Sequence, residues 1–445
     1  MAGIYTTITL NDALEDLGRA LYDPDHVRWP AAELTHYIQQ ALRTYNALTN
    51  HFRATTTFQT TVGEAFYDLP TVAPSLRANT YLVSEAVAQI AWQLMEPPLV
   101  GNLWTGTLQF SLTDVLSALE EARDAFLLET GVILTHSLLA VPGPAGTGLV
   151  DLPEEIVNLR RVAWKTGDGI ITVLRREDMW GLTNYGGSWQ TAAAASPKAY
   201  SIGTQPPLVL QTAPVTTTAG TLDLLTINRG AVLSLLDPTQ TLGVPDDWAW
   251  VVIFGALAKL LQRDGLAIDP QRADYCVSRW NHGIEMAKAA GVVLAGRVSG
   301  SPRPLGSVSD ADTYSTAWQM VPANPKRILT SGHTIVGLWP PPGVPVGGGS
   351  YTITLDVVRN APVPVALGDV LQIGPELVDG ILNYAQHLAT FKEGDGETQQ
   401  SMPLLQQFMA LCGTTVSIQK ASQPNDPAVV GQASQDPKVV AYEIA

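Results

Sequence analysis

The sequence predicts an α+β protein, and three observations along the chain support that class. The first 130 residues carry apolar side chains at helical spacing, which indicates an N-terminal helical bundle built on a helix hairpin. Short apolar runs separated by Gly and Pro follow at 131–240, a pattern typical of antiparallel strands packed like a sandwich. A strand followed by a helix then occurs twice, which indicates an internal repeat.

Helices begin the chain. A capping-box pattern, Thr9 with Asp12, opens the first predicted helix, which ends near Asp23. The second helix runs over about 30–50, begins with a proline and has one continuous apolar face. The other elements predicted before residue 130 are two short strands within 52–69 and helices near 80–95 and 112–129.

The repeat relates two segments in the second half of the chain. At an offset of 131 positions, Leu222 matches Ile353 within two apolar strands. At an offset of 130, a helix that opens at Pro245 matches one that opens at Pro375. A reused strand-and-helix unit explains both alignments, and chance similarity between two apolar segments is the alternative.

These patterns divide the chain into five predicted parts. They are a mainly helical domain at 1–130, an antiparallel β domain at 131–245, a helical pair at 246–295, a second β-plus-helix copy at 296–412, and a polar C-terminal tail at 413–445.

Composition excludes several classes of protein. The chain has 26 basic and 41 acidic residues, a net charge of −15, which argues against a protein that holds nucleic acid by neutralising phosphates. Charged residues are only 15% of the chain, which suits a surface partly covered by neighbouring molecules. The longest apolar stretch, Trp248–Leu261, is too short to span a bilayer, so no membrane partner is predicted. The N-terminal segment lacks the features of a secretory signal, and we expect folding in the cytoplasm.

No catalytic, cofactor-binding or metal-binding residue is predicted. The seven histidines are scattered singly, neither a nucleophile elbow nor a phosphate-binding loop occurs, and the paired acids are adjacent residues that would not face one pocket. The sequence therefore predicts no enzyme. One alternative stays open, a polysaccharide-acting enzyme with a Trp-lined cleft, because several tryptophans lie in Gly- and Pro-rich segments: Trp180, Trp189, Trp318 and Trp339.

Two segments carry a family resemblance. The first is LEDLGRALYDPDHVRWPAAELTHYIQQALRTYN, whose pattern positions are Leu21, Asp23, Arg28, Trp29, Glu33, Leu34, Tyr37, Ile38, Ala41 and Leu42. The second is VPDDWAWVVIFGALAKLLQRDGLAIDPQRADYCVSRWNHGI. Both resemble the paired helices of head-to-tail adaptor (connector) proteins of tailed bacteriophages, in which the later helical pair completes the body. This chain is longer than the simplest adaptors and carries an additional β-plus-helix copy.

The resemblance implies a structural virion protein without catalysis. Such a protein forms a homo-oligomeric ring below the portal, joins the capsid to the tail and continues the DNA channel. Its partners would be further copies of itself, the portal protein, tail or neck proteins, and genomic DNA that passes without specific binding. It would be assembled in the host cytoplasm and lie in the virion neck. The alternative within the same class is a tail or fibre-attachment (decorating) protein with a β-rich binding module.

Four residues of the second predicted helix region are candidate partner contacts. Trp29, Glu33, Tyr37 and Arg43 form a polar and aromatic face opposite the apolar stripe, and that face is predicted to be free for a partner. A solvated helix face is the alternative.

Overall fold

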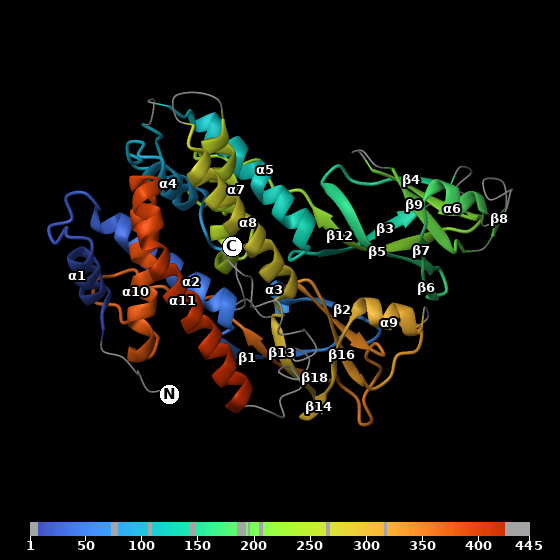
Figure 1. Cartoon of the computed structure of the whole chain (residues 1–445). Helices are drawn as coiled ribbons and strands as arrows, with labels where there is room; N and C mark the ends of the chain where they lie inside the picture. Colours follow the sequence, from blue (N-terminus) through green and yellow to red (C-terminus); the bar gives the residue numbers. More distant parts are fainter. Residues whose placement is uncertain are drawn as a thin grey trace.

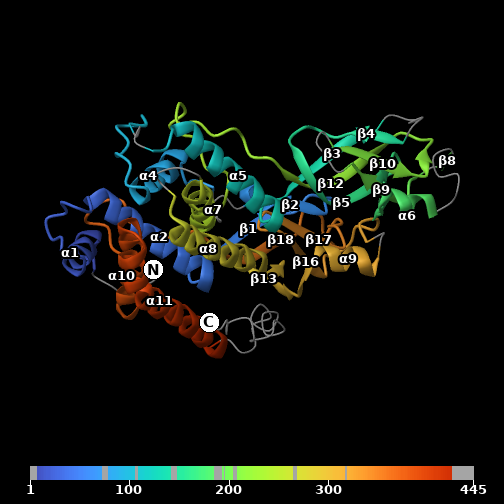
Figure 2. The same cartoon turned by 45° about the horizontal axis from the view of Figure 1, so that its top comes forward.

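The structure is a computed structural model, and it describes residues 8–72, 79–105, 109–141, 148–184, 193–194, 196–203, 208–263, 268–315 and 318–422. It confirms the α+β class, because helices and four-stranded sheets are both present in this part of the chain. Most of the helices gather at one end of the molecule and most of the strands at the other (Figures 1 and 2).

The elements form two units that share one topology. Unit A comprises α1 (Leu10–Ala20), α2 (Ala31–Thr49), β1 (Arg53–Gln59), β2 (Phe66–Asp68) and α3 (Leu69–Val72), and then β13 (Val293–Val298), β14 (Ser301–Arg303), β15 (Leu305–Ser307), α9 (Val308–Tyr314), β16 (Arg327–Ser331), β17 (Ile335–Trp339), β18 (Thr352–Val358), α10 (Pro375–Thr390), η2 (Phe391–Glu393) and α11 (Asp395–Ser422).

Unit B lies between β2 and β13 in the sequence, so one copy of the fold is inserted into the other. It comprises α4 (Val83–Gln93), α5 (Leu112–Thr130), β3 (Thr135–Val141), β4 (Leu149–Asp151), β5 (Ile156–Thr166), β6 (Ile171–Val173), β7 (Arg175–Arg176), α6 (Met179–Asn184), β8 (Ala193–Ala194), β9 (Ala199–Ile202), β10 (Val209–Ala213), β11 (Val215–Thr216), β12 (Gly220–Asn228), η1 (Asp246–Trp248), α7 (Ala249–Gln262) and α8 (Pro270–Ala289).

The sheets of the two units correspond strand by strand. Unit A has the orders β1-β18-β13-β14 and β15-β16-β17-β2, and unit B has β3-β12-β5-β6 and β7-β9-β10-β4. In both units a helix pair precedes the strands and a helix pair follows them. The short β8 and β11 form an additional two-stranded sheet in unit B.

The strand registers also agree. Leu355 of β18 faces Thr56 of β1, and Leu224, 131 positions earlier, faces Ser137 of β3. Both units have a β-bulge at the same place, since Leu294 of β13 is skipped in the pairing with β18 as Arg160 of β5 is skipped in the pairing with β12. A one-residue slip would reverse every side chain of a strand, so shared registers and a shared bulge identify a structural repeat.

The repeat predicted from the match of Leu222 with Ile353 is therefore confirmed, and it is larger than predicted. The predicted second copy at 296–412 is only the later part of unit A. The predicted boundary at residue 130 separates α5 from β3, although both belong to unit B. The sequence division differs because an insertion places the two halves of unit A on either side of unit B.

The predicted polar tail at 413–445 is wrong in its first part, because α11 continues to Ser422 instead of ending at Cys412. The hydroxyls of Thr414, Thr415 and Ser417 each donate to the carbonyl four residues earlier, so these polar side chains find their hydrogen-bond acceptors within the helix itself. Residues 423–445 lie outside the described residues.

One apolar core runs through the helices of both units, and each pair of sheets has its own core. The helix α7 is buried along its length, as its apolar sequence predicts. Within the described ranges, no helix combines the length and apolar character that crossing a membrane requires.

Candidate functional site

Within the described residues, an extensive polar site lies at the contact between the two units. Unit A contributes α2, whose hydroxyl of Tyr45 also donates to Thr415 of α11 (3.2 Å). Unit B contributes α4, η1, α7 and α8. The helix α2 is buried on nearly all sides, because its apolar face packs on α10 and its polar face meets unit B.

Two adjacent carboxylates of unit B hold the junction. Asp246 accepts hydrogen bonds from the backbone N–H of Tyr81 (2.8 Å) and from Asn360 Nδ2 (2.8 Å). Asp247, fully buried, accepts from Asn46 Nδ2 of α2 (2.6 Å) and from the Ala361 N–H (3.3 Å). Buried carboxylates are stable only when donors surround them, and here unit A supplies several of those donors.

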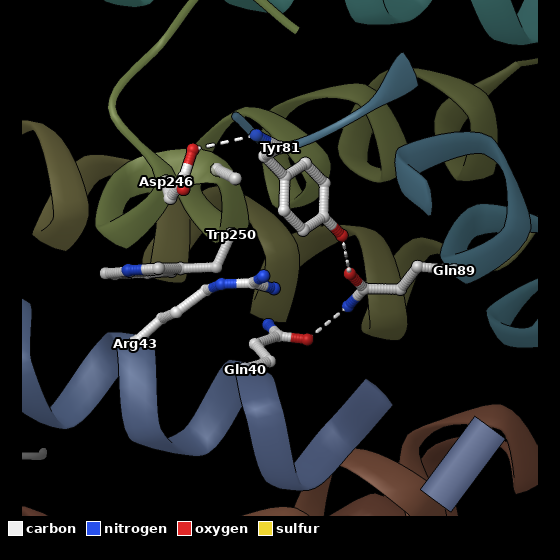
Figure 3. Close-up of a pocket in the computed structure, with 7 residues that line it drawn as sticks. Gln40, Arg43, Tyr81, Gln89, Asp246 and Trp250 are labelled. Atoms are coloured by element: carbon white, nitrogen blue, oxygen red, sulfur yellow. Dashed lines mark hydrogen bonds between the residues drawn. The ribbon is translucent and has the colours of Figure 1, made fainter. Parts of the chain in front are cut away.

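A chain of polar side chains crosses the contact beside these acids (Figure 3). The Tyr81 hydroxyl lies 2.9 Å from His36 Nε2, which is 2.9 Å from Gln89 Oε1, and Gln89 donates to Gln40. The guanidinium of Arg43 lies 4.8 Å from the centre of the Tyr81 ring. The cavity among these side chains has a volume of about 10 Å³, which leaves room for a single water molecule and excludes a substrate.

A second group of contacts joins α8 to α10. Arg279 Nη2 donates to the Tyr384 hydroxyl (2.8 Å) and its guanidinium lies 5.0 Å from the centre of the Trp250 ring. The Tyr275 hydroxyl lies 2.6 Å from His387 Nε2, and Ser401 Oγ lies 2.8 Å from its Nδ1. These bonds join α8 of unit B to α10 of unit A, while Arg279 Nε and Trp250 Nε1 are buried without a hydrogen-bond partner.

Burial shifts the histidines of the contact towards the neutral form. Desolvation lowers the pKa of His387 to about 3, and the charge of Arg279 adds to the shift. Desolvation and Arg43 lower the pKa of His36 to about 4, although its bond to Gln89 opposes the shift. Both rings are therefore neutral at pH 7 and act as hydrogen-bonding parts of the interior.

Three of the four predicted contact residues are buried inside unit A, so the expectation of a free face is wrong. Trp29 Nε1 donates to the Ala389 carbonyl (3.1 Å), and Tyr37 donates to Glu33 (3.0 Å), which pairs with Lys392 Nζ (2.9 Å). Burial raises the pKa of Glu33, and Lys392 opposes that rise. Trp29 and Glu33 thus make their contacts with α10 and η2 of the same unit.

The fourth predicted residue, Arg43, does contact another unit, but that unit belongs to the same chain. Arg43 lies against the Tyr81 ring of unit B. Sequence reasoning missed the role of Asp246 and Asp247 in this contact, because it set the paired acids aside as adjacent residues that would not face one pocket. The feature that identifies the two acids is their burial opposite a helix that carries Asn46 and Arg43. The spacing of residues in the sequence does not show which helix lies opposite the acids.

The described residues contain no group of His, Cys, Asp and Glu that could hold a metal ion. The two cysteines are free and buried, and desolvation raises the pKa of the Cys412 thiol to about 12. Among the tryptophans of the described ranges, only Trp180 is largely exposed; Trp318 is buried, Trp339 is half-buried, and Trp189 lies outside those ranges. A platform of several exposed tryptophans is therefore not present in the described part of the chain.

The two units use different surfaces on each other. Unit A contacts unit B through α2, η2 and side chains of α10, and unit B contributes α4, η1 and side chains of α8. The counterpart of α2 in unit B is α5, and its main contacts are with α4, α7 and α8 of its own unit. The counterpart of α4 in unit A is α1, and its main contacts are with α2 and α10 of its own unit. The contact is thus heterologous, because it joins unlike faces of like units.

In comparisons with known proteins, neither a family model nor a curated protein matches the chain.

Proposed function

We propose that the chain is a structural protein of a tailed-bacteriophage virion, a head-to-tail adaptor that forms a ring below the portal. In this role it joins the capsid to the tail and continues the DNA channel, and it performs no catalysis. Its partners are further copies of itself, the portal protein and tail or neck proteins.

The heterologous contact between the two units carries the proposal. A contact between unlike faces leaves one unused face at each end of the pair, and repetition of such a contact closes a ring when the rotation allows it. Each unit also has a helix pair, a β-rich middle and a later helix pair, which is the order that the resemblance implies for an adaptor body.

The two resembling segments fit this arrangement. The first covers α1 and α2 of unit A, and the second covers η1, α7 and α8 of unit B. They are the opening helix pair of one copy and the closing helix pair of the other, so both copies take part in the resemblance.

Charge supports passage of DNA without retention. A net charge of −15 gives little attraction for phosphates, so a channel formed by this chain would let the genome slide.

Electron microscopy of the purified chain, alone and mixed with the portal ring of the same virus, tests the proposal. We expect closed rings with a central opening that stack on the portal. A chain that stays single and leaves the portal bare contradicts the proposal. Labelled copies found along the tail or on fibres would instead support the tail or fibre-attachment alternative.

A further inference from the structure

We propose that the contact between units A and B is repeated between chains, so that unit B of one copy docks onto unit A of the next. The occupant of each face is a second copy of this chain. This inference rests on the proposed function, since it specifies the contact that would build the ring.

The equivalent residues of the two units follow from the shared hydrogen bonds. Thr9 before α1 bridges Val370, as Leu82 before α4 bridges Thr241, so residues of α1 match residues of α4 at an offset of 73 (82 − 9). The helices α2 and α5 end in left-handed caps at Asn50 and Gly131, which gives an offset of 81 (131 − 50).

Two buried residues of α2 have exposed counterparts on α5 of unit B, whereas Leu127, the counterpart of Asn46, is buried. Ala47 on α2 is 3% exposed, whereas its counterpart Leu128 on α5 is 39% exposed. Gln40 is buried, whereas its counterpart Glu121 is exposed. Val232, in the segment after β12, is also exposed (74%). An apolar side chain exposed where its counterpart is covered indicates a surface that a further molecule covers.

On the side of the molecule that carries α1, buried residues of unit B have exposed counterparts in unit A. Gln89 and Gln93 of α4 are buried, and Gln89 donates to Gln40 of unit A, whereas their counterparts Asp16 and Ala20 of α1 are exposed. These two residues line a groove of about 320 Å³ between α1 and α10. In unit B the corresponding space between α4 and α7 is nearly filled, because Gln40 and Arg43 of α2 enter it (Figure 3).

The groove and α5 lie on opposite sides of the helical region (Figures 1 and 2). The α5 helix of a chain therefore cannot fill the groove of the same chain. The groove and the exposed face of α5 remain available to two different neighbouring chains. Repetition of the contact then places two adaptor units per chain around the ring.

The charges at the two faces are compatible with this contact. Asn360 donates to Asp246 within the chain, and their counterparts are Arg229 at an offset of 131 and Glu376 at an offset of 130. Arg229 has a side chain that is 64% exposed, and Glu376 is exposed. In the repeated contact, Arg229 of one chain and Glu376 of the next would form an ion pair, at the place where Asn360 and Asp246 form a hydrogen bond within the chain.

The acids Glu121 and Asp16 also meet in the repeated contact. Glu121 is already paired with Lys259 (2.7 Å) and Asp16 with Arg19 (3.1 Å). The docking therefore brings together two ion pairs rather than two unpaired carboxylates, which lowers the repulsion between them.

Two variants that each block one face test the inference. Leu128→Arg places a charge on α5, and Ala20→Trp fills the groove. Each should weaken self-association by at least about 30-fold, the effect of losing a central interface residue. Mixed together they should form dimers and nothing larger, because one groove and one α5 face remain intact. Ile170→Arg, at an equally exposed position (40%) in the β5–β6 turn, is the control and should assemble as the wild type does.

Mass photometry of the free chain and of the chain on the portal ring reads the result, and thermal unfolding verifies that each variant folds. Assembly that both variants retain overturns the inference and leaves the proposed function standing. A wild-type chain that stays monomeric in both settings overturns both. In addition, Arg229→Glu and Glu376→Arg should each weaken assembly, and the double variant should restore it; equal loss in the double variant contradicts the assigned pair.

Discussion

Asn46 of α2 and Asp247 of η1 lie 201 positions apart, and a hydrogen bond of 2.6 Å joins Asn46 Nδ2 to Asp247 Oδ2 in the buried contact between the units. The same amide also donates to the Arg359 carbonyl, and its oxygen accepts from the Phe52 N–H. One side chain thus ties together the end of α2, the strand β18 and the start of α7.

Asn46→Leu should destabilise the chain by about 3 kcal/mol, because it leaves a buried carboxylate and a buried N–H without their partner. Urea unfolding at pH 7 measures the change in midpoint. Asn11→Leu is the matched control: its amide bonds to Glu15 on the exposed face of α1, and the expected change is within about 0.5 kcal/mol. A similar loss of unfolding free energy in both variants would contradict a stabilising role for the Asn46–Asp247 hydrogen bond.

The buried pair of Glu33 and Lys392 should behave as a coupled unit. Lys392→Met leaves the Glu33 carboxylate buried without its cation, and we expect a loss of about 3 kcal/mol. The double variant Glu33→Gln with Lys392→Met removes both charges and should regain most of the stability. Additive losses in a double-mutant cycle by denaturant unfolding would show that the two side chains do not interact.

Acid should weaken the fold through its neutral histidines. The folded-state pKa values of His36 and His387, about 4 and about 3, lie below the ordinary histidine value of 6.5. Between these values the unfolded chain binds more protons, so the contribution is complete above pH 6.5 and is lost as the pH falls towards 4. In that window each histidine contributes up to about 1.4 kcal/mol per pH unit to the slope of the unfolding free energy against pH. His387→Gln should give a shallower fall of the unfolding free energy between pH 7 and pH 5, and an unchanged slope would contradict this assignment.

Close packing of α7 on α8 should depend on the absence of a side chain at Gly255. A Cβ there would lie 2.5 Å from the Trp280 ring and 3.1 Å from the Ala122 Cβ. Gly255→Ala should therefore destabilise by about 1–3 kcal/mol. Gly413→Ala in α11 meets no atom within 4 Å and should stabilise slightly, by up to about 1 kcal/mol, because alanine favours the helix. Thermal unfolding of the two variants separates packing from helix propensity, and equal signs would refute the packing explanation.

The sequence was sufficient to predict the fold class and the strand-and-helix repeat, because β12 and β18 keep the same apolar alternation and nearly the same spacing to the following helix. The earlier half of the repeat was missed. It relates α2 to α5 at an offset of 81 and α1 to α4 at an offset of 73, and an inserted unit breaks any single offset. A signal existed in the matching core positions of α2 and α5, such as Tyr45 with Phe126.

The contact residues were predicted less well, for a physical reason. Gln40, Arg43 and Asn46 form a polar helix face that looks like a solvent-facing surface in sequence. In the fold this face meets Gln89, Tyr81 and Asp247, whose polarity matches it. Polar complementarity between segments far apart in the sequence leaves no local periodicity, so only the folded structure reveals it.

The insertion of unit B into unit A also fixes an order of events during synthesis. Unit B is one continuous segment, whereas the edge strand β1 must wait for β18, and their residues Gln59 and Thr352 lie 293 positions apart. At about 5–20 residues per second the ribosome needs roughly 15–60 s to supply that partner. Throughout that interval the N-terminal helices are tethered beside a unit that can already fold, and the sheet that contains β1 closes only when β18 emerges.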